Sequence, residues 1–181
     1  MTRYEEFEKA VAFFVEANEQ FVGANKHLFD VKVSERCFCG ALMNQMNLLL
    51  NFTKSCYRNY YVDVEYNRDG EDFKRNIENK KISCDIILHS RGNFPNDNII
   101  AIEMKKESNS NDPESDKARL MDMTKPTCSD REVCGYALGI FYTIAETYDK
   151  IDLEYYKDGK KVDGLIEQID LNEIWKKQEH K

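Results

Sequence analysis

The sequence has few histidines, and its cysteines are not spaced as in small folds that depend on a structural metal ion or on disulfide bonds. Its three histidines are scattered at His27, His89 and His180, and no Cys-x-x-Cys pair occurs among its six cysteines. A structural zinc site needs four thiolate or imidazole ligands at close spacing, so the sequence argues against one. We expect the cysteines to be reduced and to serve as small buried apolar residues.

Long hydrophobic runs and several well-known catalytic motifs are absent as well. No apolar run approaches the roughly 20 residues that span a bilayer, and residues 1–6 lack the cationic-then-apolar pattern of a signal peptide. We therefore expect a cytoplasmic protein with no membrane partner. The sequence also lacks a Ser-His-Asp arrangement, a glycine-rich phosphate loop and a Rossmann fingerprint, which argues against those reaction classes.

The composition is that of a globular chain. Its 181 residues are enough for one domain with a sizeable core, and 41% of them are hydrophobic while 33% are charged. The formal net charge of −7 argues against a general nucleic-acid binder, which usually has a basic excess. It does not argue against a nuclease, because a metal-dependent active site is itself acidic.

Hydrophobic periodicity predicts an α/β fold with a mixed central β-sheet flanked by helices. We interpret residues 1–181 as one domain, with an N-terminal packing helix in 1–26, a core in 27–143, and a hairpin and short helix in 144–181. The expected helices cover 4–25, 34–52, 113–123 and 171–177. The expected strands cover 60–66, 83–89, 98–106 and 135–143, followed by a hairpin of 151–156 and 160–169.

Two of these expected strands carry charges that need an explanation. Asp85 lies in the first, and Glu103 and Lys105 lie in the second, among Ile, Leu and Ala residues. A buried charge is costly unless it is paired or bound to a metal. Strand side chains alternate between faces, so Glu103 and Lys105 point one way and Met104 the other. If the strands pair, Asp85 reaches the same place, which predicts a site for a hard divalent cation beside an amine.

These residues resemble the D…ExK signature of the PD-(D/E)xK nuclease superfamily, whose restriction-endonuclease-like fold has an αβββαβ core. The chain is more similar still to a group of small bacterial members of that superfamily. Cys84 stands where the superfamily name has proline. The segments that carry the resemblance are Ser34-Glu35-Arg36, Val62-Asp63-Val64-Glu65-Tyr66-Asn67-Arg68, Asp85-Ile86-Ile87-Leu88-His89-Ser90-Arg91-Gly92, Ile102-Glu103-Met104-Lys105-Lys106 and Asp116-Lys117-Ala118-Arg119-Leu120.

The resemblance implies metal-dependent hydrolysis of phosphodiester bonds in nucleic acid, with DNA favoured over RNA. Asp85 and Glu103 would bind Mg²⁺ or Mn²⁺ together with the Met104 carbonyl. Lys105 would hold the attacking water and stabilise charge on the phosphate. The structural alternative is a carboxylate pair bridged by Lys105. Glu35 would support the metal site from a helix N-terminus, or it is a surface residue favoured by the helix dipole.

Further residues are candidates for contact with the substrate. The candidates for phosphate binding are Arg36, Arg68, Lys74 and Lys106. A solvated surface charge is the alternative for each of them. His89 is either a base or a structural histidine held by its neighbours. Lys117 could touch a phosphate, although an exposed charge pair with Asp116 is the simpler explanation.

A second function from another class is consistent with the same residues. The chain would then be a catalytically inactive module of the nuclease fold that binds protein or nucleic acid. The net negative charge of the chain and the lack of a separate DNA-recognition domain favour this alternative. Small members of the superfamily often work as oligomers, so a homo-oligomer is left open.

Overall fold

The computed structural model describes residues 2–52, 55–69, 72–73, 83–109, 112–126 and 134–179. Within these ranges a seven-stranded sheet runs in the order β1-β4-β5-β6-β7-β8, with β9 beside β7. The strands are β1 (Tyr61–Val64), β4 (Ile86–His89), β5 (Asn98–Lys106), β6 (Leu138–Ile144), β7 (Lys150–Lys157), β8 (Lys160–Val162) and β9 (Gln168–Asp170). β5 and β6 run parallel, and the other described neighbours in this sheet are antiparallel.

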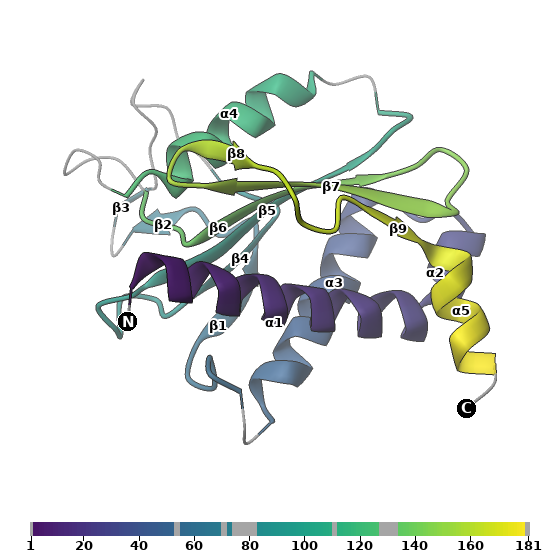
Figure 1. Ribbon diagram of the computed structural model, residues 1–181, viewed down its shortest axis with the longest axis horizontal. Coiled ribbons are helices and arrows are strands. Elements are labelled where there is room, and N and C mark those ends of the chain that lie inside the picture. Colours follow the sequence, from purple (N-terminus) through teal and green to yellow (C-terminus); the bar gives the residue numbers. More distant parts are fainter. Residues whose placement is uncertain are drawn as a thin grey trace.

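Helices cover both faces of the sheet, as the sequence predicts. α1 (Arg3–Ala24) and α3 (Glu35–Leu50) lie on one side, and α4 (Pro113–Thr124) lies on the other (Figure 1). Short helices α2 (Lys26–Asp30) and α5 (Leu171–Glu179) pack near the end of α1. A separate two-stranded sheet pairs β2 (Arg68–Asp69) with β3 (Asp72–Phe73). The expected mixed sheet flanked by helices is therefore confirmed.

The helix starts follow local side-chain chemistry. Thr2 and Glu5 form a reciprocal capping box at α1, in which each side chain accepts a hydrogen bond from the other's backbone N–H. Ser34 caps α3 by accepting from the Cys37 backbone N–H at 3.3 Å. Asp112 caps α4, and Pro113 occupies its first turn, where a missing N–H costs nothing.

The side-chain alternation of β5 divides the core into two layers. Ile100, Ile102 and Met104 belong to the larger cluster, which also contains the apolar faces of α1 and α3. Ala101 belongs to the smaller cluster, which contains Leu120 of α4. Consequently Glu103 and Lys105, which share the parity of Ala101, lie on the α4 side of the sheet.

Some expected elements differ in detail. The strand expected over 160–169 is two short strands, β8 and β9, and Gly164 between them has a φ of +84°, which an extended strand cannot accommodate. The strand expected from residue 135 begins at Leu138. The sequence did not predict α2, which is little more than one helical turn, or β2 and β3, which have two residues each, because such short elements show no hydrophobic period.

The cysteine expectation is correct only in part. Cys39 and Cys84 are buried and free, as predicted, whereas Cys37 and Cys56 are free but exposed. Cys134 is disulfide-bonded, so the expectation of reduced thiols throughout the chain is wrong at this position. No helix in the described ranges has both the length and the apolar character needed to cross a bilayer.

Truncating Phe38 should destabilise the protein strongly. Its ring is fully buried and lies 4.8 Å from the Phe29 ring and 6.5 Å from the Phe21 ring, measured between centroids. We expect Phe38→Ala to lower the free energy of unfolding by about 3–5 kcal/mol. Phe52→Ala is the matched control, because Phe52 is 61% exposed, and it should change stability by less than about 0.5 kcal/mol. Urea unfolding measures both, and equal effects would contradict this packing.

Candidate active site

The pairing of β4 with β5 brings the predicted acidic residues together. Ile86 lies opposite Ile102 in an antiparallel register, so Asp85 and Glu103 occupy the next position along the ladder. Asp85 Oδ2 accepts a hydrogen bond from the Met104 backbone N–H at 2.7 Å. Met104 itself points to the other face, where its sulfur lies 3.7 Å from Cys39 Sγ. Asp85, Glu103 and Lys105 therefore share one face at one end of the sheet.

Helix α4 adds two residues that the sequence analysis did not place in the site. Asp116 is 6% exposed, and its Oδ2 lies 3.0 Å from Lys105 Nζ. Arg119 forms an ion pair with Glu103 and lies 3.2 Å from Asp116 Oδ1. The expected exposed charge pair of Asp116 and Lys117 is thus wrong, because Asp116 is buried and Lys117 pairs with Glu154 at 2.7 Å.

A signal for Asp116 was present in the sequence. It precedes Leu120 by four residues and Met123 by seven, and both of these are buried in the smaller core cluster. Residues at this spacing share one face of a helix. An acid on the apolar face of α4 should therefore meet a cation, and Lys105 on the neighbouring strand is that partner.

Glu35, the first residue of α3, reaches the same end of the sheet from the opposite layer. Its Oε1 accepts hydrogen bonds from the Lys106 backbone N–H at 2.8 Å and from Asn109 Nδ2 at 2.9 Å. Its charge also raises the pKa of Asp85, although less than burial does. Glu35 therefore ties the end of β5 to α3 and adds a fourth carboxylate to the neighbourhood.

Burial raises the pKa of two of these carboxylates, Asp85 and Glu103. Glu103 is 3% exposed, and burial raises its pKa from the usual 4.5 to about 7, against the attraction of Arg119. Burial also raises the pKa of Asp85, while the Met104 N–H and Lys105 oppose that shift. When all are ionised, the four carboxylates exceed the two cations, Lys105 and Arg119, by two negative charges. A divalent cation carries the charge that would balance them.

The donor atoms of the cluster are of the type that a hard metal ion prefers, but their present positions do not form a complete metal site. All candidate donors are carboxylate oxygens, which Mg²⁺ and Mn²⁺ prefer. Asp116 Oδ2 is buried and faces Lys105 as an ion pair without accepting an aligned hydrogen bond. Among the described residues, however, no three acidic, imidazole or thiol groups converge to hold an ion. Arg119 forms an ion pair with Glu103, and Lys105 forms one with Asp116. A metal ion would have to displace at least one of these two cations.

The predicted phosphate contacts have different surroundings. Arg36 is exposed and pairs with Glu65 at 2.9 Å, and the Glu65 backbone N–H donates to the Asp85 carbonyl at 3.1 Å. That ion pair therefore lies at the rim of the acidic cluster. Lys106 Nζ approaches the Val33 carbonyl at 3.4 Å. The side chain of Arg68 and the whole of Lys74 lie outside the described residues.

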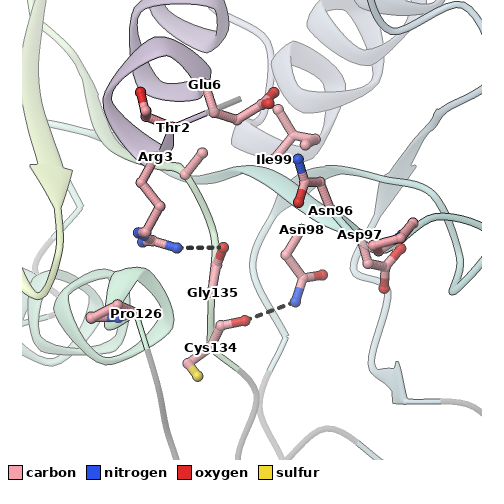
Figure 2. A pocket seen from close by; sticks show the side chains of 12 residues that line it. Thr2, Arg3, Glu6, Asn96, Asp97, Asn98, Ile99, Pro126, Cys134 and Gly135 are labelled. Carbon is pink, nitrogen blue, oxygen red and sulfur yellow. Dashed lines mark hydrogen bonds between the residues drawn. The ribbon is translucent and has the colours of Figure 1, made fainter.

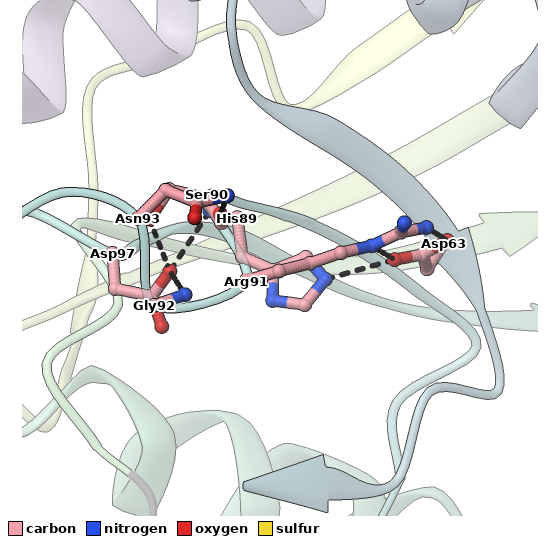
Figure 3. A network of polar contacts seen from close by, with 7 residues as sticks. All are labelled: Asp63, His89, Ser90, Arg91, Gly92, Asn93 and Asp97. Carbon is pink, nitrogen blue, oxygen red and sulfur yellow. Dashed lines mark hydrogen bonds and ion pairs between the residues drawn. The ribbon is translucent and has the colours of Figure 1, made fainter. Parts of the chain in front are cut away.

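His89 lies at the far end of β4 from Asp85, and its side chain belongs to a network of polar contacts (Figure 3). It is 2% exposed, and its Nε2 is 2.9 Å from Asp63 Oδ2. Arg91 Nε donates to the same carboxylate oxygen at 2.9 Å. These contacts favour the interpretation of His89 as a structural histidine that joins β1 to the start of the β4–β5 loop.

Stability should depend on pH through Glu103. Because its pKa is about 7 in the folded protein and near 4.5 otherwise, the folded state binds the proton more tightly between these values. The free energy of unfolding should therefore fall as pH rises from 4.5 to 7, by about 3 kcal/mol from this residue. Glu103→Gln should remove that component. Urea unfolding at pH 5 and pH 8, without divalent cations, tests it, and an unchanged difference between variant and wild type would contradict it.

Comparison of the chain with protein-family models, with curated proteins and with solved structures gives no significant match.

Proposed function

We propose that this chain is a metal-dependent phosphodiesterase that hydrolyses nucleic acid, with DNA favoured over RNA. The site would be of the PD-(D/E)xK type on a restriction-endonuclease-like core. The observation that carries the proposal is the meeting of Asp85, Glu103 and Lys105 from two paired strands on one face of the sheet. Apart from the separate β2–β3 pair inserted after β1, the order α3-β1-β4-β5-α4-β6 also follows the αβββαβ order of that fold.

Each residue has a role in this proposal. Asp85 and Glu103, with the Met104 carbonyl, would hold Mg²⁺ or Mn²⁺. When bound, such an ion supplies Lewis acidity and lowers the pKa of a coordinated water. Lys105, oriented by Asp116 at 3.0 Å, would stabilise the negative charge that develops on the phosphate oxygens. Glu35 is a positioning residue, because it fixes the β5 backbone next to Lys105.

The rim of the cluster offers contacts for the nucleic-acid backbone. Arg36 is exposed and pairs with Glu65, whose backbone N–H donates to the Asp85 carbonyl. Lys106 follows Lys105 on β5 and reaches the Val33 carbonyl from the α3 side of the sheet. Cations at such a rim can bind phosphates and align the scissile bond without reading sequence. In hydrolysis, the water oxygen bonds to phosphorus, the bond from phosphorus to the leaving sugar oxygen breaks, and that oxygen gains a proton.

Lys105→Ala should abolish most of the nuclease activity. Loss of a group that stabilises transition-state charge typically costs about 10²–10³-fold in rate, and Lys105 is the strand amine nearest the acids. Lys150→Ala is the control, because Lys150 is half exposed and pairs only loosely with Asp152, at 3.5 Å. Cleavage of plasmid and single-stranded DNA with Mg²⁺ or Mn²⁺ measures both variants, and circular dichroism checks their folding. Equal activity of Lys105→Ala and wild type would contradict the assignment.

One observation favours the inactive module as a second candidate. Arg119 and Lys105 already neutralise Glu103 and Asp116, as structural ion pairs do. A protein of this kind would keep the cluster for stability and bind no divalent cation. Metal binding therefore separates the two functions.

Asp85→Asn should weaken Mn²⁺ binding at least tenfold, because it removes one of the two carboxylates assigned to the ion. Asp163→Asn changes an exposed aspartate of the C-terminal region and should leave affinity unaltered. Titration calorimetry at pH 8, where Glu103 is mostly ionised, measures both. Failure of the wild type to bind Mn²⁺ at millimolar concentration would favour the inactive module.

A further inference from the structure

A polar cavity of about 280 Å³ lies at the opposite end of β5 from the acidic cluster. Figure 2 shows Arg3 and Glu6 extending from α1, with Asn96, Asp97 and Asn98 from the segment that enters β5. Asn98 is the first residue of β5, and Lys105 lies seven residues further along it. At about 3.3 Å per residue, the two sites are on the order of 20 Å apart.

The buried carboxylate of Glu6 is the unusual feature of this cavity. Glu6 is 6% exposed, and its Oε1 accepts a hydrogen bond from the Tyr57 hydroxyl at 2.8 Å. Its Oε2 is buried as well, yet no described group forms a hydrogen bond with it. An unpaired buried carboxylate oxygen costs several kcal/mol. A residue that carries this cost on the wall of a cavity is a candidate for binding a ligand.

Arg3, the cation that lines this cavity, is already engaged elsewhere. Arg3 Nε pairs with Asp158 at 2.9 Å, and its Nη2 donates to the Thr124 carbonyl at 3.1 Å. Its Nη1 donates to the Gly135 carbonyl at 3.4 Å, as Figure 2 shows. The charge of Arg3 is thus offset by Asp158 and by backbone carbonyls, which leaves the Glu6 carboxylate without a cationic partner among the described contacts.

The opposite wall adds more acceptors than free donors. Asp97 Oδ1 accepts from the backbone N–H groups of Ser90 and Gly92, each at 2.9 Å, and these bonds help to lower the pKa of Asp97. Asn98 Nδ2 donates to the Cys134 carbonyl at 2.8 Å, so its side-chain oxygen remains an acceptor. With Glu6 on the other wall, the cavity therefore has two carboxylates and amide oxygens, which disfavour an anion and favour a molecule that donates hydrogen bonds and carries positive charge.

We infer that this cavity binds a small organic cation, whose ammonium or guanidinium group pairs with the Glu6 carboxylate. Its volume is near the lower end of the roughly 300–1,000 Å³ of small-molecule sites. A divalent metal is a poorer match, because the described lining has two carboxylates, Glu6 and Asp97, and Asp97 already accepts hydrogen bonds from Ser90 and Gly92. This inference is independent of nuclease activity.

The first test compares two probes of the same shape and different charge. Butylguanidinium should bind the wild-type protein at millimolar concentration or below, whereas neutral butylurea should bind at least tenfold more weakly. Titration calorimetry and ligand-observed magnetic resonance measure both. Equal binding of the two probes would overturn the inference. Absence of binding by either would show that the cavity holds water only, and it would overturn the inference as well.

The second test locates the bound probe. Glu6→Gln removes the charge and should weaken butylguanidinium binding at least tenfold, and Glu19→Gln, on the exposed face of α1, should leave it unchanged. Thermal unfolding monitors whether the variants are folded. If a folded Glu6→Gln variant bound butylguanidinium with wild-type affinity, the probe would bind elsewhere and its assignment to Glu6 would be wrong. The comparison of the two probes on the wild type stands even if Glu6→Gln fails to fold.

Discussion

The register between β4 and β5 is the constraint on which the rest of this structure depends. A slip of one residue would move Glu103 and Lys105 into the apolar layer beneath α1 and α3 and would move Met104 out of it. The loop between the two strands limits such a slip. Asp97 binds the backbone of Ser90 and Gly92 within that loop, and Asp63 holds His89 and Arg91 at its start. The polar network of Figure 3 therefore supports the acidic cluster from a distance.

Two opposing effects decide the character of the acidic cluster. Burial penalises ionised Asp85 and Glu103, and Lys105 and Arg119 partly offset that penalty. The compensation is incomplete, because carboxylates outnumber cations. An incompletely neutralised buried cluster lowers the stability of the fold, but it can bind a cation. Functional sites commonly lose stability in this way in favour of function. The same ion pairs are also what an inactive relative would keep, so cation binding is the property that distinguishes the two.

Helix α4 links the two ends of the sheet. Asp116 and Arg119 near its start meet Lys105 and Glu103, whereas the Thr124 carbonyl at its end accepts a hydrogen bond from Arg3 beside the polar cavity. Strand β5 connects the same two places, from Asn98 to Lys105. One helix and one strand thus position both candidate sites, and each site contains at least one buried carboxylate that the fold only partly pairs.

The sequence by itself determined the features that depend on local periodicity and on backbone chemistry. The span of α1, the cap at Ser34 and the opposite directions of Met104 and its neighbours on β5 follow from spacing alone. The tertiary structure alone decided that Arg119 pairs with Glu103 and that Glu6 keeps an unpaired oxygen. These outcomes depend on which distant segments pack together and on how much water they exclude, and no local pattern in the chain encodes either quantity.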